Sequence, residues 1–598
     1  MEHSLHSLTA GTLGSRFFLL LTMFPFTPLR NPIGFGAVDT IELFLAIVLV
    51  SLALGWKRWI APASARFARK TAWCMSLLAI LPIALRLLLL AHHPVPVPDL
   101  YDEFGHLLVA DTLLHGRLAN PPHALPQFFE TFFVLQRPTY SAIYPIGNGL
   151  MMALGTLIFG TPWAGVLLGA GAFCALCYWM LRAWVPPAWA LLGGVFAVCL
   201  FGPINQWTNT YWGGELSAAA GCLVYGALPR LSRPSWRAPA ILLGVGIAIH
   251  FLTRPYETVF LVLSVALYFL FRRVQWRALL IAGLVILPAI GITLLQNKRV
   301  TGEWTKLPYQ LSMYQYGVPA PLTFQASLTP HAPLTREQDF DYRMQRAFHP
   351  GPETLSSYLR RLAFRIRYYR FYFYAPMYLA LPAFLVSVRS YRWAWVPLSC
   401  LLFALGANFF PAFQFHYVAA AACLFVLMSV AGLQRITRWP YGVSIARLIL
   451  FLCLAQFAFW YGAHLLDAPV LAYDVWDSVN HGQPERRIEV QKEIAQIPGK
   501  LLVFVRYWPR HPFQDEWVYN GADIDSQRVV WARDLGDAEN RKLIAYYPNR
   551  DKYVLEPDAR PPALSVYQPA ELEPAVIAPE PAPNKNAKKP MLELEQVK

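Results

Sequence analysis

Three carboxylates follow one another closely after an apolar segment of the chain: Asp99, Asp102 and Glu103. Neighbouring acids near a membrane surface repel each other, which raises the pKa of one of them. One acid can then act as a general base while its neighbour orients a donor or a cation. The alternative is a solvated helix N-terminus, where Asp102 and Glu103 interact with the helix dipole and have no catalytic role. These residues alone leave both interpretations open.

A second polar segment, 205–215, lies between two apolar segments and combines amides, aromatic rings and an acid. Its candidate substrate-binding residues are Asn209, Tyr211, Trp212 and Glu215. Aromatic faces and amide groups are what a sugar ring binds, although Trp and Tyr also gather at bilayer interfaces as anchors. A carboxylate at the head of a membrane span is costly unless it is paired or functional, so Glu215 is the stronger candidate.

A tight turn between two later apolar segments contains Arg254, Tyr256 and Glu257. A guanidinium group in this position can hold a phosphate through two hydrogen bonds. The alternative is a salt bridge between Arg254 and Glu257 that closes the turn. We therefore treat all three residues as candidates for substrate binding, with the arginine as the phosphate ligand.

Basic residues also border a long loop, which Lys298 and Arg299 open. Five arginines close it: Arg360, Arg361, Arg365, Arg367 and Arg370. An anionic lipid headgroup such as a polyprenyl phosphate would explain these arginines, and so would an interfacial helix whose side chains reach ordinary phospholipid. His416, at the end of another apolar segment, is a candidate acid or base, or a hydrogen-bonded residue of the interface.

The composition requires that most of the chain lies in lipid. The 598 residues are 56% hydrophobic and only 15% charged, and the mean hydropathy is +0.35. Because roughly 20 apolar residues cross a bilayer, we expect about twelve spans. The predicted segments are 36–56, 71–91, 163–182, 187–204, 215–229, 239–254, 256–271, 277–296, 373–388, 393–410, 416–434 and 443–464. The predicted fold class is an all-α polytopic membrane protein with additional interfacial helices.

Basic clusters orient these spans. The formal net charge is +15, but the Lys and Arg residues lie in short clusters in every second loop, which indicates cytoplasmic loops and argues against nucleic acid as a partner. This alternation requires that the apolar segment 144–160 does not cross, so we predict an interfacial helix there. The candidate residues then share the non-cytoplasmic side, in the outer loops 92–162 and 297–372 and the shorter outer turns.

Four regions follow from the pattern of the chain. Residues 1–35 are an N-terminal segment, and residues 36–464 form the transmembrane domain. Residues 465–558 form a small α/β module on the non-cytoplasmic side, with a helical pattern near 485–497 followed by short β-rich runs. Residues 559–598 are rich in Pro, Ala and charge, which predicts a disordered tail. All eight cysteines lie in apolar segments, so neither disulfides nor a metal site are expected from them.

The residues Asp102-Glu103, Ala110, Leu114, Gly116, Asn120-Pro121-Pro122 and Tyr144-Pro145 resemble the first outer loop of the GT-C superfamily of membrane glycosyltransferases. Aminoarabinose transferases and protein O-mannosyltransferases belong to this superfamily. The residue-level match is confined to about 99–150. The resemblance implies a polyprenyl-phosphate sugar donor, transfer outside the cytoplasm, and Asp102 or Glu103 as the catalytic base that activates the acceptor. It also implies that Glu215 stands where many relatives place a second acid.

We therefore predict that the chain is a glycosyltransferase that lies among membrane lipids and transfers the sugar to a lipid, glycan or protein acceptor. No cofactor is demanded, and a divalent cation between phosphate and carboxylate is left open. A lipid or sugar transporter or flippase is the alternative, and an assembly factor built around the C-terminal module is a third hypothesis. The expected location is a bacterial inner membrane, with several spans and a periplasmic C-terminus.

Overall fold

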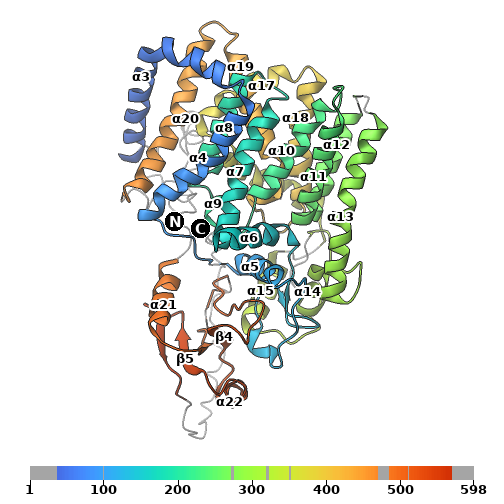
Figure 1. Cartoon of the computed structure of the whole chain (residues 1–598), viewed down its shortest axis with the longest axis vertical. Helices are drawn as coiled ribbons and strands as arrows, with labels where there is room; N and C mark the ends of the chain where they lie inside the picture. Colours follow the sequence, from blue (N-terminus) through green and yellow to red (C-terminus); the bar gives the residue numbers. More distant parts are fainter. Residues whose placement is uncertain are drawn as a thin grey trace.

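The computed structural model describes residues 37–98, 100–270, 272, 275–317, 322–326, 328–348, 352–468, 484–509, 511–512 and 514–568. Asp99, the predicted N-terminal segment 1–35 and most of the predicted tail lie outside the described residues. A bundle of long helices forms the upper part of the molecule in Figure 1. Its helices are α3 (Ala37–Phe67), α4 (Thr71–Leu88), α7 (Pro162–Leu181), α8 (Pro187–Phe201), α10 (Glu215–Ala227), α11 (Arg237–Thr253), α12 (Pro255–Phe269), α13 (Trp276–Thr301), α17 (Leu381–Ser387), α18 (Tyr391–Ala407), α19 (Ala422–Ile436) and α20 (Gly442–Leu465). Short 3-10 helices extend it: η1 (Leu89–Ala91), η3 (Leu228–Arg230), η5 (Ala375–Leu379) and η6 (Phe415–Ala421).

Every predicted apolar segment overlaps with one of these helices. Among the described residues, five helical stretches are long and apolar enough to cross a membrane: Thr71–Ala91, Pro162–Leu181, Trp276–Thr301, Phe415–Ile436 and Gly442–Leu465. The bundle also contains shorter apolar stretches, such as Pro187–Phe201, Arg237–Thr253 and Pro255–Phe269, so the number of about twelve spans stays a prediction. The surface of the bundle is apolar, with Leu284 and Leu287 of α13 each 56% exposed. Such a surface suits lipid rather than water.

Shorter elements lie at the lower end of the bundle. They are α5 (Tyr101–Leu114), η2 (Pro126–Phe129), β1 (Val134–Leu135), β2 (Ser141–Ala142), α6 (Ile146–Phe159), α9 (Gln206–Asn209), α14 (Pro308–Tyr316), α15 (Arg336–Phe348), α16 (Leu355–Arg365) and η4 (Ile366–Tyr372). In Figure 1, α6 runs across the ends of α7 and α10 instead of alongside them. This is the orientation expected of the segment 144–160 as an interfacial helix.

The C-terminal module contains a four-stranded sheet below these elements. Its elements are α21 (Pro484–Gln496), β3 (Leu501–Val505), β4 (Val529–Arg533), α22 (Asp537–Tyr546), β5 (Asp551–Glu556) and β6 (Ala563–Val566). The strand order is β4-β3-β5-β6, with β3 parallel to β4 and β5 and β6 antiparallel to β5. The α/β pattern matches the sequence prediction, in which the module ends at residue 558. Strand β6 lies beyond it, because a four-residue edge strand flanked by prolines has too little pattern to stand out from a polar tail.

The central strand of this sheet joins the module to the first outer loop. All five residues of β3 are buried. Leu501 and Val503 share a core with α21 on one face, whereas Leu502 and Phe504 share a second core with η2 and α5 on the other. Alternate residues of a strand point to opposite faces of the sheet. The first outer loop therefore packs against one face of the module's sheet, and α21 packs against the other.

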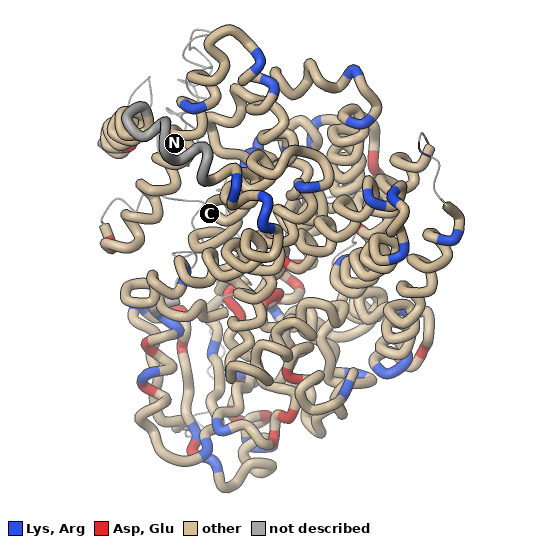
Figure 2. The backbone as a smooth tube through the Cα atoms, turned by 45° about the horizontal axis from the view of Figure 1, so that its top comes forward, with Lys and Arg blue, Asp and Glu red and all other residues tan. Residues whose placement is uncertain are grey.

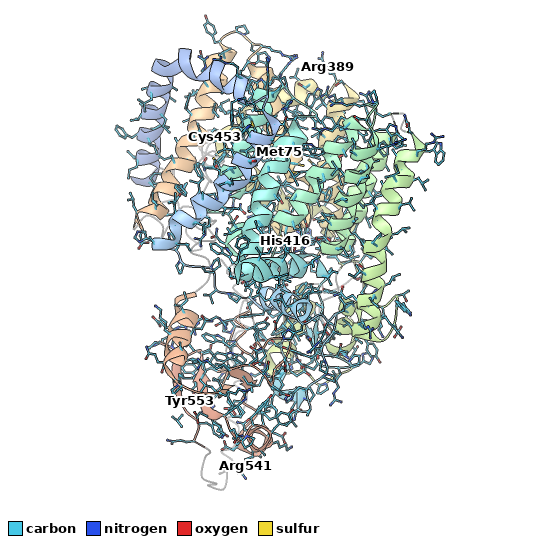
Figure 3. All side chains as sticks on the ribbon, in the orientation of Figure 1. Met75, Arg389, His416, Cys453, Arg541 and Tyr553 are labelled. Atoms are coloured by element: carbon cyan, nitrogen blue, oxygen red, sulfur yellow. The ribbon has the colours of Figure 1, made fainter. Side chains whose placement is uncertain are left out.

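Charge divides the molecule along its length. Figure 2 shows mostly Lys and Arg at the upper end of the bundle, whereas Asp and Glu gather in the centre and in the lower part. The basic ends belong to the loops that the sequence assigns to the cytoplasm, and Arg389 marks this end in Figure 3. The outer loops and the module occupy the opposite end.

Candidate functional site

Helix α5 carries both acids of the first outer loop, but their side chains have different surroundings. Glu103 is 4% exposed, and its carboxylate accepts hydrogen bonds from the backbone N–H of Leu100 at 3.2 Å and of Tyr211 at 2.9 Å. The first of these bonds caps α5, and the second fixes the helix to the loop before α10. Glu103 therefore anchors the helix start.

Asp102 instead faces a cluster of polar groups at the end of the bundle. Its carboxylate accepts a hydrogen bond from the Tyr144 hydroxyl, and the side chain of Trp212 also favours its charged form. Burial raises the pKa of Asp102 to about 6, although Tyr144, Trp212 and the positive charge of Arg254 oppose the rise. A carboxylate with this pKa is ionised at neutral pH and basic enough to accept a proton.

Trp212 belongs to a turn whose shape depends on the two glycines after it. Gly213 and Gly214 have φ values of +83° and +140°, which side chains with a Cβ rarely adopt. The turn ends at Glu215, the first residue of α10. Both carboxylate oxygens of Glu215 are buried and have no hydrogen-bond partner in the described part of the chain. An unpaired buried carboxylate is costly, so its position points to a functional role.

Arg254 lies between α11 and α12 and reaches the same cluster. One of its Nη atoms is 3.5 Å from the carbonyl oxygen of Trp212, and its Cζ lies 5.7 Å from the centre of the Tyr417 ring. Its Nε is buried without a hydrogen-bond partner among the described residues. No ion pair within 4.0 Å joins it to Glu257 in this part of the chain, so the alternative of a salt bridge that closes the turn is not realised.

The charge of Arg254 acts on groups from four separate parts of the chain. It interacts electrostatically with Asp102, His106, Glu215, His250, Glu257 and His416. His416 is 3% exposed, and its ring meets that of Trp212 edge-on at 5.5 Å. Figure 3 places His416 at the end of the bundle above α6. The predicted residues Asp102, Trp212, Glu215, Arg254, Glu257 and His416 thus converge.

Other candidates lie outside this cluster or make structural contacts. Asn209 accepts a hydrogen bond from Arg86 at 2.5 Å, and the Tyr211 hydroxyl donates to Pro96 O at 2.9 Å. The Tyr256 hydroxyl donates to Gly406 O at 3.2 Å. Lys298 and Arg299 are exposed near the end of α13, where Lys298 donates to Gly302 O at 2.6 Å. No contact of these residues points to a ligand.

Sequence reasoning gave no role to three residues at the site: His106, Tyr144 and Asp341. His106 lies one turn after Asp102 on α5, and this i, i+4 spacing was the signal that could have found it. Its ring is 4.1 Å from that of Tyr144, and both ring nitrogens are buried without a partner among the described residues. Burial, with help from Arg254, lowers the pKa of His106 to about 3. His106 is therefore a neutral group that can donate or accept a hydrogen bond.

The third missed residue is Asp341 of α15, which interacts electrostatically with Asp102. Burial, with a contribution from the charge of Asp102, raises the pKa of Asp341 to about 7, while a hydrogen bond from Gln345 opposes the rise. Its position 239 residues after Asp102 leaves no local signal in the sequence. Among the described residues, no group of three or more His, Cys, Asp or Glu side chains is placed to hold a metal ion.

No protein-family model matches the sequence, and no curated protein does. The structure is similar to that of ArnT from Cupriavidus metallidurans in the apo state, with a TM-score of 0.47, 12% identity, and coverage of 82% of this chain and 93% of that chain. A structure of ArnT bound to undecaprenyl phosphate gives a TM-score of 0.47 at 11% identity, covering 81% and 93%. The archaeal oligosaccharyltransferase AglB from Archaeoglobus fulgidus, in complex with an inhibitory peptide and a dolichol-phosphate, gives 0.42 at 11% identity, covering 81% and 69%. Both proteins are GT-C glycosyltransferases, the class that the sequence resembles, but a likeness this distant assigns no residue and no substrate to this chain.

Proposed function

We propose that this chain is a membrane glycosyltransferase that moves a sugar from a polyprenyl-phosphate donor to an acceptor hydroxyl on the periplasmic side. One observation carries the proposal: Asp102 and Arg254 both interact with Trp212, whose side chain favours the charged form of the carboxylate and whose carbonyl oxygen lies 3.5 Å from the guanidinium. A base and an anion ligand thus share one partner.

The chemistry needs both groups. The oxygen of the acceptor hydroxyl attacks the anomeric carbon of the donor sugar while the Asp102 carboxylate takes the hydroxyl proton. The bond between that carbon and the phosphate oxygen breaks, and the polyprenyl phosphate leaves with the electron pair. The Arg254 guanidinium, which has no carboxylate partner within 4.0 Å among the described residues, stabilises the charge on the leaving phosphate. Both groups are held in place before the substrates arrive, which lowers the cost of positioning.

The location of the cluster favours a transferase over a transporter. Transporters bind their substrates near the middle of the bilayer, at broken helices. Here His416 lies at the lower end of the bundle in Figure 3, next to the outer helices and away from Arg389 at the basic end. The basic loops at that opposite end support a periplasmic position for the cluster.

The test is sugar transfer in membrane vesicles from a radiolabelled pool of polyprenyl-phosphate sugars. We expect Asp102→Asn to lower the transfer by about 10²- to 10⁴-fold and Arg254→Gln to lower it by roughly 10- to 100-fold at low donor concentration, whereas exposed Arg541→Gln does not change it. Undiminished transfer by Asp102→Asn would remove the proposed base. Movement of the intact lipid-linked sugar across the vesicle membrane, without transfer to an acceptor, would instead identify a flippase.

A further inference from the structure

Helix α16 has its polar and apolar faces reversed relative to a helix of a soluble protein. Its large apolar side chains point outward: Leu355 is 74% exposed, Leu359 51% and Phe364 50%, and Ile366 just after the helix is 67% exposed. Its inward side chains are Tyr358, Arg361 and Arg365, of which Arg365 is only 4% exposed. In water this arrangement would leave apolar surface uncovered.

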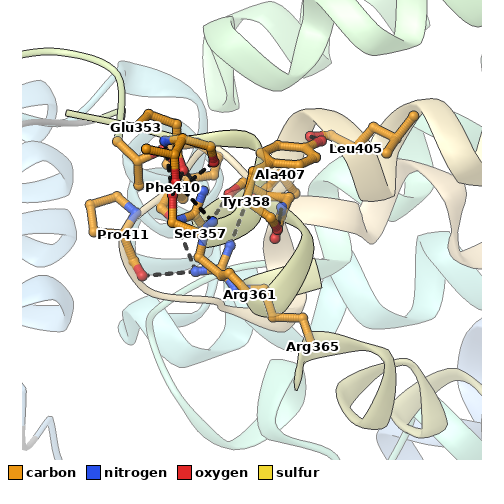
Figure 4. A network of polar contacts seen from close by, with 12 residues as sticks. Glu353, Ser357, Tyr358, Arg361, Arg365, Leu405, Ala407, Phe410 and Pro411 are labelled. Carbon is orange, nitrogen blue, oxygen red and sulfur yellow. Dashed lines mark hydrogen bonds and ion pairs between the residues drawn. The ribbon is translucent and has the colours of Figure 1, made fainter. Parts of the chain in front are cut away.

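The inward face binds the end of α18. Arg365 donates to the carbonyl oxygens of Ala407, Phe410 and Pro411 at 3.1, 2.8 and 2.8 Å, and the Tyr358 hydroxyl donates to Leu405 O at 2.7 Å. Figure 4 shows these side chains directed at the turn after α18. The last carbonyl groups of a helix lack partners within it, so this network satisfies them and fixes the rotation of α16.

A second arginine completes the attachment. Arg361 Nε donates to Asn408 O at 2.8 Å, and one of its Nη atoms is 2.6 Å from a carboxylate oxygen of Glu353 (Figure 4). Both side chains of this ion pair are less than a fifth exposed, at 17% and 12%. Because the polar side chains are engaged inward, α16 cannot turn its apolar face toward the protein without losing these bonds.

The outward face carries two cationic side chains beside the apolar ones. Arg360 and Arg367 are exposed, and the Arg367 guanidinium lies 3.6 Å from the centre of the Phe364 ring. The neighbouring α18 also presents apolar side chains to the outside, with Leu398 42% and Leu401 48% exposed. An apolar face bordered by arginines is the pattern of a helix lying at the boundary between acyl chains and anionic headgroups.

We propose that α16 is a membrane-interface helix that inserts Leu355, Leu359, Phe364 and Ile366 among lipid acyl chains and binds anionic phospholipid headgroups through Arg360 and Arg367. The occupant of this face is the bilayer itself. The assignment holds whether or not the chain transfers a sugar. It also explains four of the five arginines on the outer side: Arg361 and Arg365 bind the end of α18, and Arg360 and Arg367 face the lipid surface.

A spin label tests the position of α16. All eight native cysteines are buried, so Leu359→Cys can be labelled selectively in the full-length protein, in vesicles of phosphatidylcholine with phosphatidylglycerol. Oxygen concentrates in the acyl region, and a nickel chelate stays in water. We expect the label at 359 to collide with oxygen several-fold more often than with the chelate, and a label at exposed Lys542→Cys in α22 to show the reverse. Equal ratios at both sites would overturn the proposal, as would a label at 359 shielded from both reagents, which would mean a protein partner.

The headgroup contact has its own measurement. Removal of phosphatidylglycerol should lower the oxygen-to-chelate ratio at residue 359, since each arginine near an anionic surface contributes about 1 kcal/mol, or roughly fivefold in partitioning. In Arg360→Gln/Arg367→Gln this dependence on phosphatidylglycerol should disappear, and Arg541→Gln in the module should leave it intact. A dependence that survives the double substitution would exclude these two arginines as headgroup ligands.

Discussion

The hydroxyl group of Tyr144, two residues before α6, donates a hydrogen bond to the carboxylate of Asp102 in the first turn of α5. The contact requires the Tyr144 ring to lie directly against α5. Gly105 allows this approach, because a Cβ at that position would lie 2.5 Å from Cε2 of the ring. The two interfacial helices of the first outer loop therefore position the candidate base jointly.

The pH dependence of transfer should report the protonation of Asp102. Burial raises the pKa of Asp102 to about 6, and the base works only when it is ionised. We expect kcat/KM to rise about tenfold per pH unit below pH 6 and to level off above about pH 7. A pH profile of transfer in vesicles checks this. A flat profile between pH 5 and about pH 7 would contradict the assignment.

Substitution of Tyr144 should move that profile. The hydroxyl donates to the charged form of Asp102 and so lowers its pKa. Tyr144→Phe removes the donor, so the pKa of Asp102 should rise. The inflection of the pH profile should therefore shift to higher pH. The shift distinguishes this role from simple loss of packing, which would lower kcat without moving the inflection.

Substitutions of the adjacent acids Asp102 and Glu103 should have different effects on activity and stability. Asp102→Asn should lower kcat by about 10²- to 10⁴-fold, the usual contribution of a general base, with little effect on stability. Glu103→Gln places an amide NH2 against one of two backbone N–H donors, at Leu100 or Tyr211. The expected cost is about 1–3 kcal/mol of stability. Thermal unfolding in detergent and sugar transfer, both measured for the two variants, test these expectations. A loss of transfer in Glu103→Gln, with a loss of stability in Asp102→Asn, would make Glu103 the base.

Arg254 should control affinity for the lipid phosphate. Hydrogen bonds to charged groups contribute about 1.5–3 kcal/mol, so Arg254→Gln should weaken binding of undecaprenyl phosphate by roughly 10- to 100-fold. Arg541→Gln, at the far end of the module in Figure 3, is the control. The measurement is the stabilisation of the purified protein against heat by undecaprenyl phosphate. Equal stabilisation of both variants would exclude Arg254 as the phosphate ligand.

The attachment of the module to α5 should depend on Asp111. Its carboxylate accepts a hydrogen bond from the backbone N–H of Ala522 at 2.6 Å. Asp111→Ala leaves this amide without an acceptor. The free energy of local opening should fall by about 1.4 kcal/mol, which corresponds to tenfold faster hydrogen exchange. We expect this increase in residues 519–524 by mass spectrometry. Glu539→Ala, which breaks only an exposed ion pair with Lys542, should change exchange in that segment little.

The sequence by itself determined the membrane character of the chain, the helical segments and the α/β type of the C-terminal module. These features depend on local hydropathy and periodicity, which each segment carries in its own residues. The sequence also identified Asp102, Trp212, Glu215, Arg254 and His416 as candidates, because polar residues at the ends of apolar segments are conspicuous.

Only the tertiary structure decided which candidates lie close together. It separated Asp102 from Glu103, since their roles depend on which neighbours each carboxylate meets. It brought Asp341 to Asp102 across 239 residues, and it turned the polar face of α16 inward against the end of α18. It also made the first outer loop the second layer of the module's sheet. Each of these results depends on contacts between distant segments, and a pattern within one segment cannot contain them.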